Sequence, residues 1–146
     1  ARIFHENPHT LLALKQRPDL AAIFVEEALR FYSPFSATVR RTTKDVELAG
    51  QKIPAGELVV PLIASANRDE QVFTDPDTFK LDREANPHLA MGFGIHFCLG
   101  AHLARLEGKI VAEEMARRYS SVTLTNPKTA TVGDLGGPKE LMVVVA

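Results

Sequence analysis

The single cysteine of the chain, Cys98, stands in a glycine-rich segment that directly precedes a predicted helix. From Met91 to Gly100 this segment reads Met-Gly-Phe-Gly-Ile-His-Phe-Cys-Leu-Gly. The amides and the positive dipole end of a helix start favour a thiolate over a thiol, and a thiolate binds metal ions. Gly94 and Gly100 would let backbone amides approach the sulfur, which tunes a thiolate–iron centre. Without further motifs, however, a lone cysteine is more often a small buried hydrophobe.

Two other kinds of site deserve weighing at the same segment. His96, Cys98 and His102 could be three zinc ligands, but no convincing fourth ligand lies nearby and the spacing departs from the usual zinc motifs. The glycines do not form a dinucleotide-binding fingerprint, because an aromatic residue occupies the place of the third glycine and no strand with its crossover surrounds them. Neither alternative accounts for the segment as well as a thiolate ligand does.

A second group of candidate residues is charged. Glu27 and Arg30 are spaced three apart, so both side chains lie on one face of a predicted helix. On a solvated surface such a pair is worth only about a few tenths of a kcal/mol. Arg40 follows this helix on a predicted strand, next to Arg41, and Arg83 lies in a later loop. Taken alone, each of these arginines is most simply a solvated charge.

The elements that must position these residues follow from periodicity and turn signals. Helical spacing of apolar residues predicts a long helix on each side of an extended loop region, and changes of period predict strands between and after them. The predicted elements are a helix over Pro18–Tyr32, a small antiparallel sheet over Ala37–Val60, a short helix over Ile63–Arg68, an irregular meander over Asp69–Leu89, a helix from Gly100 to Tyr119, and strands over Val122–Leu124 and Leu141–Val145. The fold class is therefore mainly α with small antiparallel β-sheets.

Composition excludes some classes of partner. The chain has 146 residues, of which 45% are hydrophobic and 24% charged, as in an ordinary globular domain, and we treat it as a single region. A formal net charge of -1 offers no uniform field for nucleic acid, and no apolar run is long enough to span a membrane. One cysteine cannot form an internal disulfide, which suits a reducing, cytoplasmic compartment. The first residue is not Met, so the chain reads as the interior of a longer protein. His5, His9 and His88 are expected at the surface.

Considered together, these motifs resemble the cytochrome P-450 family of heme-thiolate monooxygenases, in its soluble bacterial form. The resemblance rests on the order Gly-x-Gly-x-His-x-Cys-x-Gly followed by Leu-Ala-Arg, on a Glu-x-x-Arg helix, and on a meander containing Asn67-Arg68-Asp69 and Asp75-Pro76. It implies the C-terminal part of the family's fold: Glu-x-x-Arg helix, small sheet, meander, cysteine loop, long proximal helix and C-terminal β-hairpin.

The resemblance also implies roles for particular residues. Cys98 would be the axial ligand of the iron of heme b, iron protoporphyrin IX. His96 and Arg40 would reach heme propionates, and Ala104 would pack against the ring. The remaining positions of the cysteine loop would surround the heme: Met91, Gly92, Gly94 and Gly100. Met91 departs from the family, which usually has Phe at this position. Glu27, Arg30 and Arg83 would form a structural network behind the loop.

The implied activity is insertion of one oxygen atom from O2 into a small organic substrate, with electrons from a ferredoxin- or flavodoxin-like partner. Substrate-facing positions would lie near Pro34–Val39 and Gly136–Lys139. The family's N-terminal part, with the distal oxygen-activating helix, is not encoded in these 146 residues, so no catalytic residue is assigned. A rival hypothesis is a truncated, non-catalytic heme-binding fragment or remnant, with apolar surface exposed where the absent part would pack.

Overall fold

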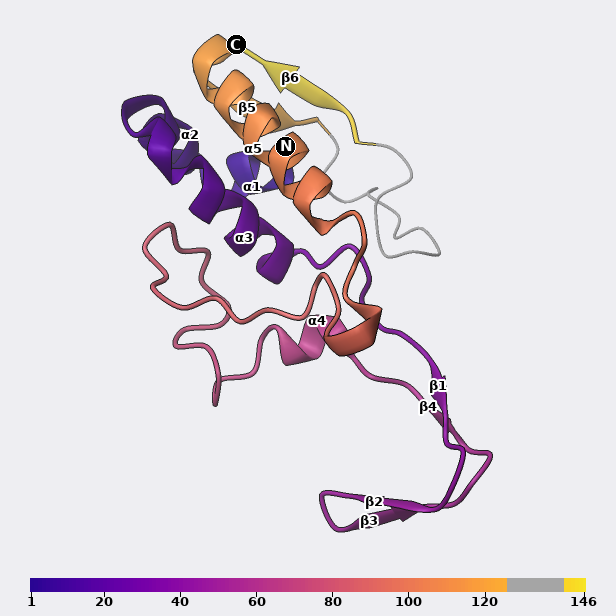
Figure 1. Ribbon diagram of the computed structural model, residues 1–146. Helices are drawn as coiled ribbons and strands as arrows, with labels where there is room; N and C mark the ends of the chain where they lie inside the picture. The colour runs from indigo at the N-terminus through magenta and orange to yellow at the C-terminus, as the bar shows by residue number, and fades with distance from the viewer. Residues whose placement is uncertain (126–140) are drawn as a thin grey trace.

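The computed structural model describes residues 1–125 and 141–146 (Figure 1). These residues form helices and short strands in the following order: α1 (Arg2–Glu6), α2 (His9–Gln16), α3 (Ala21–Phe31), β1 (Arg40–Arg41), β2 (Val46–Leu48), β3 (Gln51–Ile53), β4 (Leu58–Val59), α4 (Ile63–Ala66), α5 (Ala101–Arg118), β5 (Val122–Leu124) and β6 (Val143–Val145). Helices α1, α2, α3 and α5 gather with β5 and β6 into one body, while β1 to β4 form an arm that extends away from it (Figure 1). The predicted class, mainly α with small antiparallel sheets, is confirmed.

Helix α3 begins three residues later than its sequence pattern predicts. Pro18–Leu20 form a separate 3-10 turn, and the α-helix then runs over Ala21–Phe31. Phe24 of this helix stacks on Phe4 of α1 with ring centroids 5.0 Å apart, and it meets Phe79 of the meander edge-on at 5.7 Å. Such aromatic pairs add to the stability that burial alone provides. Helix α3 is thus the element around which the N-terminal helices and the meander pack.

Helix α5 packs against α3 through small side chains. Ala101, Ala112 and Ala116 are its buried residues, and a Cβ on Gly108 would lie only 3.1 Å from a methyl carbon of Val25. This glycine therefore permits a close crossing of the two helices. The large apolar residues whose spacing predicts the helix lie elsewhere: Leu103, Leu106 and Ile110 are all exposed. The periodicity locates the helix correctly, whereas the small residues form its contact with the core.

The predicted sheet over residues 37–60 divides into two separate pairs of antiparallel strands. Strand β2 pairs with β3, and β1 pairs with β4. The tight turn between β2 and β3 is formed by Ala49 and Gly50, which have φ angles of 49° and 78°. Two consecutive positive φ angles are typical of the hairpin turns whose twist matches that of the strands.

The meander contains no regular element between α4 and the cysteine loop, as its sequence predicts. Its aromatic residues provide the anchors: Phe73 is 2% exposed and Phe79 is 7% exposed. A loop of this length is uncommon in a compact domain unless it has a function of its own. Its route from α4 back across the end of α3 brings the chain to the cysteine loop (Figure 1).

The last two strands close the body beside α1 and α5. Strand β5 pairs antiparallel with β6, in register Val122 to Val145. The expected substrate-facing turn over Gly136–Lys139 lies outside the described residues. None of the helices that the structure describes is both long and apolar enough to cross a membrane.

Candidate functional site

The cysteine loop is closed by backbone hydrogen bonds at both ends. The amide of Cys98 donates to the carbonyl of Met91 at 2.8 Å, so the loop returns to its own starting point. Between them, Gly94–His96 form a 3-10 turn. The amide of Ala101, the first residue of α5, donates to the carbonyl of Cys98 at 3.2 Å. Cys98 therefore stands directly before the N-terminus of an 18-residue helix, where the macrodipole favours a negative sulfur.

Three glycines shape this loop. Gly92 and Gly94 have φ angles of +76° and +65°, a region in which side chains bearing a Cβ are strained. A Cβ on Gly92 would also lie 3.0 Å from the carbonyl oxygen of His96. A Cβ on Gly100 would lie 4.0 Å from the sulfur of Cys98, so this residue sits immediately beside the thiol. The glycines thus fix the path of the loop and leave the sulfur approachable.

Several apolar side chains of the cysteine loop are left uncovered. Phe93, Ile95 and Leu99 retain 84%, 98% and 101% of their accessible surface, and Cys98 itself is exposed. Met91 is the exception, because its side chain is only 8% exposed. A row of exposed apolar side chains on one loop is typical of a surface that binds an apolar group or another part of a protein.

Behind the loop lies a buried charge network centred on Glu27. Its carboxylate forms ion pairs with Arg30 at 2.7 Å and with Arg83 at 3.0 Å. The side chains of Glu27 and Arg30 are fully buried, and that of Arg83 is 6% exposed. The amide of Lys80 and the side chain of Asn86 also donate to Glu27, at 3.0 and 3.1 Å. The structure therefore brings Glu27, Arg30 and Arg83 together and adds donors from the meander.

The protonation of Glu27 reflects two opposing effects. Burial raises the pKa of its carboxyl, but the hydrogen bonds from Arg30 and Arg83 outweigh burial, and the pKa is lowered. Glu27 is therefore ionised at neutral pH. Arg30 carries the connection onward, since its guanidinium donates to the backbone carbonyls of Asn67 and Pro76 at 2.9 and 2.7 Å. One ion pair on α3 thus holds both the end of α4 and the meander.

Asn67 is a site residue to which sequence reasoning gave no role. It is fully buried; its amide nitrogen donates to the hydroxyl of Ser33 at 2.7 Å, and its side-chain oxygen accepts from the amide of Leu89 at 2.7 Å. Leu89 lies two residues before the cysteine loop begins. A polar residue at the end of a short helix is a weak signal by itself, and only the folded chain shows that it links α3 to the entrance of the loop.

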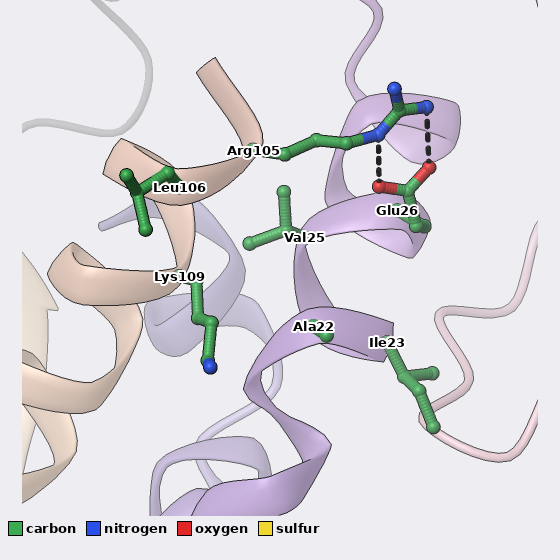
Figure 2. A pocket seen from close by; sticks show the side chains of 7 residues that line it. All are labelled: Ala22, Ile23, Val25, Glu26, Arg105, Leu106 and Lys109. Carbon is green, nitrogen blue, oxygen red and sulfur yellow. Dashed lines mark hydrogen bonds and ion pairs between the residues drawn. The ribbon is translucent and has the colours of Figure 1, made fainter. Parts of the chain in front are cut away.

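A second charge cluster joins α3 to α5 on the edge of a pocket between them. Arg105 forms two hydrogen bonds with the carboxylate of Glu26, at 2.7 and 3.0 Å (Figure 2). Ala22, Ile23, Val25, Leu106 and Lys109 complete the lining of the pocket. Burial raises the pKa of the Glu26 carboxyl, but the hydrogen bonds from Arg105 and His88 lower it by more than burial raises it. The pKa of Glu26 is therefore depressed overall.

His88 belongs to this second cluster, and the expectation that it lies at the surface is wrong. Its side chain is 2% exposed, and its Nε2 lies 3.1 Å from Glu26. The amide of Ala90 donates to its Nδ1 at 3.2 Å, so Nδ1 is unprotonated and Nε2–H donates to Glu26. Burial lowers the pKa of His88 more than Glu26 raises it, which keeps the ring neutral. The fixed ring orientation anchors the segment leading into the cysteine loop.

The other predicted positions are His96, which lies in the cysteine loop itself, and Arg40 and Ala104, which lie on β1 and α5. Arg40 is exposed on β1, where its guanidinium donates to Thr38 Oγ1 at 3.0 Å and to the carbonyl of Val39 at 2.8 Å. His96 is exposed in the 3-10 turn of the cysteine loop. Ala104 lines a hollow of about 800 Å³ together with apolar residues of α1, α3, α5 and β6. Neither Arg40 nor His96 contacts Cys98 through a hydrogen bond in the part of the chain that the structure describes.

The donor set distinguishes between a heme and a zinc site. Among residues 1–125 and 141–146, no three His, Cys, Asp or Glu side chains are grouped so that they could hold a metal ion, so His96, Cys98 and His102 are not brought together as zinc ligands. The loop instead offers one exposed sulfur beside a glycine and among apolar side chains. Such a loop would hold an apolar cofactor whose metal takes one sulfur ligand from the protein.

Comparison with known proteins agrees with this geometry. The family model described as cytochrome P-450 matches residues 4–140. The chain is 50% identical over 121 residues to cytochrome P-450 119 of Sulfurisphaera tokodaii, covering 83% of this chain and 33% of that protein. It is 43% identical to the biotin biosynthesis cytochrome P-450 of Bacillus subtilis, covering 83% of this chain and 31% of that protein. The crystal structure of CYP109E1 from Bacillus megaterium in complex with testosterone superposes with a TM-score of 0.89 at 41% identity, covering 97% of this chain and 40% of that chain.

The chain thus spans about a third of the length of the curated relatives it matches. The superposition covers 97% of this chain, so it takes in the backbone of the cysteine loop and of helices α3 and α5. The observed order of elements agrees with the C-terminal part of that fold. The chain belongs to the cytochrome P-450 family.

Proposed function

We propose that this chain forms the heme-binding, proximal part of a heme-thiolate monooxygenase, which inserts one oxygen atom from O2 into a small organic substrate. The observation that carries the proposal is the position of Cys98: an exposed sulfur at the start of α5, beside Gly100, in a loop fixed by two left-handed glycines. Bound heme supplies the iron at which oxygen is activated, and the axial thiolate donates electron density that favours cleavage of the oxygen–oxygen bond.

Cys98 would be the axial ligand of heme b. The exposed side chains of the loop would then lie against the heme or against the remainder of the protein, which accounts for apolar residues such as Phe93 and Leu99 being left uncovered. Met91 is buried, and its carbonyl closes the loop, so it would support the thiolate from the protein side. Ala104 would lie close to the heme ring along the same helix.

His96 and Arg40 would bind the heme propionates. His96 is exposed in the cysteine loop and Arg40 is exposed on β1, where its partners are local ones, Thr38 and the carbonyl of Val39. A carboxylate is a better partner for a guanidinium, because two charge-assisted hydrogen bonds can form. Arg40 would therefore turn from its own strand to a propionate when heme binds.

The network of Glu27, Arg30 and Arg83 would hold the loop in place and take no part in proton or electron transfer. Its side chains are buried and mutually satisfied, and they reach the segment that enters the loop through Asn86. Removing one partner of a buried ion pair lowers the free energy of unfolding strongly, although the intact pair adds little compared with apolar residues in the same place. Such a network therefore constrains the geometry of the segments that it joins. Loop position is therefore its proposed role.

Partners and compartment are part of the same proposal. Electrons would come from a ferredoxin- or flavodoxin-like protein, and the distal side of the heme would be provided by a part of the protein outside these residues. Substrate would approach the segment Pro34–Val39. A single cysteine, with no possible internal disulfide, is consistent with the cytoplasm. Because the names of the relatives refer to such different molecules as biotin and testosterone, we assign no particular substrate.

The direct test is the absorption spectrum of the reduced, carbon monoxide-bound form of the full gene product. We expect heme uptake and a strongly red-shifted Soret band that disappears in Cys98→Ala. His102→Ala, four positions further along and also exposed, is the matched control and should retain the band. Absence of heme in the parent protein, or an unchanged band in Cys98→Ala, would contradict the proposal.

One observation favours a second candidate, a non-catalytic heme-binding fragment. The chain spans about a third of its curated relatives, and large apolar residues of α5, among them Leu103, Leu106 and Ile110, are exposed. The two candidates differ in turnover. Oxygen consumption coupled to product formation, with a suitable electron donor, would establish the monooxygenase, whereas heme binding with no coupled oxygen consumption would establish the fragment.

A further inference from the structure

The cluster of Glu26, His88 and Arg105 does not belong to the Glu27 network, although Glu26 and Glu27 are adjacent in sequence. Its three side chains come from α3, from the segment entering the cysteine loop, and from α5. They converge on the carboxylate of Glu26, which accepts three hydrogen bonds. Because the two ends of the loop, His88 before it and Arg105 after it, are tied to one carboxylate, their separation is fixed.

Arg105 is also directed toward the cysteine side of the loop. Its guanidinium carbon lies 5.9 Å from the centroid of the Phe97 ring, and Phe97 is the residue directly before Cys98. The hydrogen bond with Glu26 raises the pKa of Arg105. The cation therefore lies next to the residue that precedes Cys98, and the bidentate pair with Glu26 fixes its position.

We propose that Arg105, held by Glu26, is a positioning residue whose cation tunes the reduction potential of a heme iron bound by Cys98. The inference rests on the proposed function and adds to it a regulator of that site. Reduction adds a negative charge to the centre, so a nearby cation stabilises the reduced state and a nearby anion destabilises it. Glu26 and Arg105 therefore act on the potential in opposite directions.

This opposition separates a tuning role from a merely structural one. In Arg105→Gln, Glu26 is left without its cation, and we expect the potential of the heme to shift to a more negative value. In Glu26→Gln, the charge of Arg105 is no longer balanced, and we expect a shift to a more positive value. A role limited to holding the loop would instead shift both variants in the same direction, because both lose the same pair of hydrogen bonds.

The chain provides matched controls on the same element. Glu114 and Arg117 form an exposed pair near the other end of α5, with N–O distance 2.7 Å. Glu114→Gln and Arg117→Gln make the same changes in net charge and are expected to leave the potential unchanged. Arg105→Lys keeps the charge but loses the bidentate geometry, so its potential should fall between those of the parent and Arg105→Gln. If Arg105→Gln fails to fold, the potential of Arg105→Lys is compared with that of the parent protein instead.

The experiment is a spectroelectrochemical titration of the heme-loaded full gene product. Shifts of opposite sign in the Glu26 and Arg105 variants, absent from both controls, would support the proposal. Shifts of the same sign, no shift, or an Arg105→Lys value equal to that of Arg105→Gln would overturn it while leaving Cys98 ligation intact. A parent protein that takes up no heme would contradict the proposed function itself, and this outcome is recognised before any variant is compared.

Discussion

Arg30 lies in the buried charge network of α3 and Phe93 lies on the cysteine loop, and their exposures are the reverse of what their residue types suggest. The guanidinium of Arg30 is fully buried in the support behind the loop, whereas 84% of the Phe93 surface on the loop itself is exposed. In the support, each charge has partners from several segments. On the loop, the apolar side chains of Phe93, Ile95 and Leu99 are exposed. The charged residues of the network are therefore paired within the described residues, whereas these apolar side chains are left for another group to cover.

The strongest way to break the support is to remove its central carboxylate. Glu27→Ala leaves Arg30 buried without an anion, and loss of one partner of a buried pair costs about 3–5 kcal/mol. We expect a decrease of that size in the free energy of unfolding, measured by chemical denaturation. Glu114→Ala is the control, since it removes a carboxylate that also binds two arginines, Arg117 and Arg118, but at the surface. Equal losses in the two variants would contradict the account.

Asn67 tests whether the support reaches the loop entrance. Asn67→Ala removes the acceptor for the amide of Leu89 and the donor to Ser33, and an unsatisfied buried group costs about 1–3 kcal/mol. Ser33→Ala removes the hydroxyl partner of Asn67 but keeps the acceptor for Leu89, so its loss of unfolding free energy should be smaller than that of Asn67→Ala. Thermal or chemical unfolding of both variants measures the difference. An equal loss in Ser33→Ala would show that the Leu89 contact contributes nothing.

Gly92 and Gly94 test what fixes the path of the cysteine loop. Gly92→Ala and Gly94→Ala both force a left-handed backbone on a residue with a Cβ, at a cost of about 1–2 kcal/mol. Only at Gly92 does the added carbon also meet a backbone oxygen, that of His96, while at Gly94 it meets open space. We therefore expect a larger fall in melting temperature for Gly92→Ala. Identical falls would show that backbone strain alone accounts for both glycines.

The smallest expected effect concerns pH. Burial lowers the pKa of His88 from its ordinary value of 6.5, so the unfolded chain takes up a proton more readily than the folded chain. Stability is therefore full above about pH 6.5 and declines as the pH falls from there toward the folded-state pKa. His88→Gln should remove this part of the decline in the free energy of unfolding, whereas His9→Gln, at an exposed position on α2, should not.

The carboxylates add a separate decline at lower pH. The pKa of Glu27 is depressed in the folded state, because its hydrogen bonds outweigh its burial. The stability contributed by Glu27 is therefore present above its unfolded value of 4.5 and is lost as the pH falls through the lower folded value. A parent protein whose stability is independent of pH between 7 and 5 would contradict the contribution assigned to His88.

Much of the fold could be predicted because local pattern determines it. Apolar periodicity gives α3 and α5, the Ala49-Gly50 signal gives a hairpin, and the absence of any period gives the meander. The orientation of α5 could not be predicted from its large apolar residues, because Gly108 and the buried alanines allow a closer approach to α3 than leucine would. Close packing between helices depends on shape in three dimensions, which hydrophobicity alone does not contain.

The site divides in the same way. Cys98 and the Glu27–Arg30 spacing stand out in the sequence because their residue types and separations are unusual. His88, in the meander, and Asn67, at the end of α4, do not stand out, because each is given its role by a partner distant in sequence. These partners are Glu26, 62 residues from His88, and Leu89, 22 residues from Asn67. Polar residues in loops are normally solvated, so their burial here becomes evident only once the meander is folded against α3.

The central claim is that the sulfur of Cys98 is an axial ligand of heme iron, and X-ray absorption at the iron edge of the purified full gene product tests it most directly. We predict one sulfur atom in the first coordination shell of the iron in the parent protein. In Cys98→Ala, either heme stays bound and the sulfur is missing from that shell, or the protein no longer retains heme. An iron shell of nitrogen and oxygen alone in the parent protein, or a sulfur that persists in Cys98→Ala, would contradict the account.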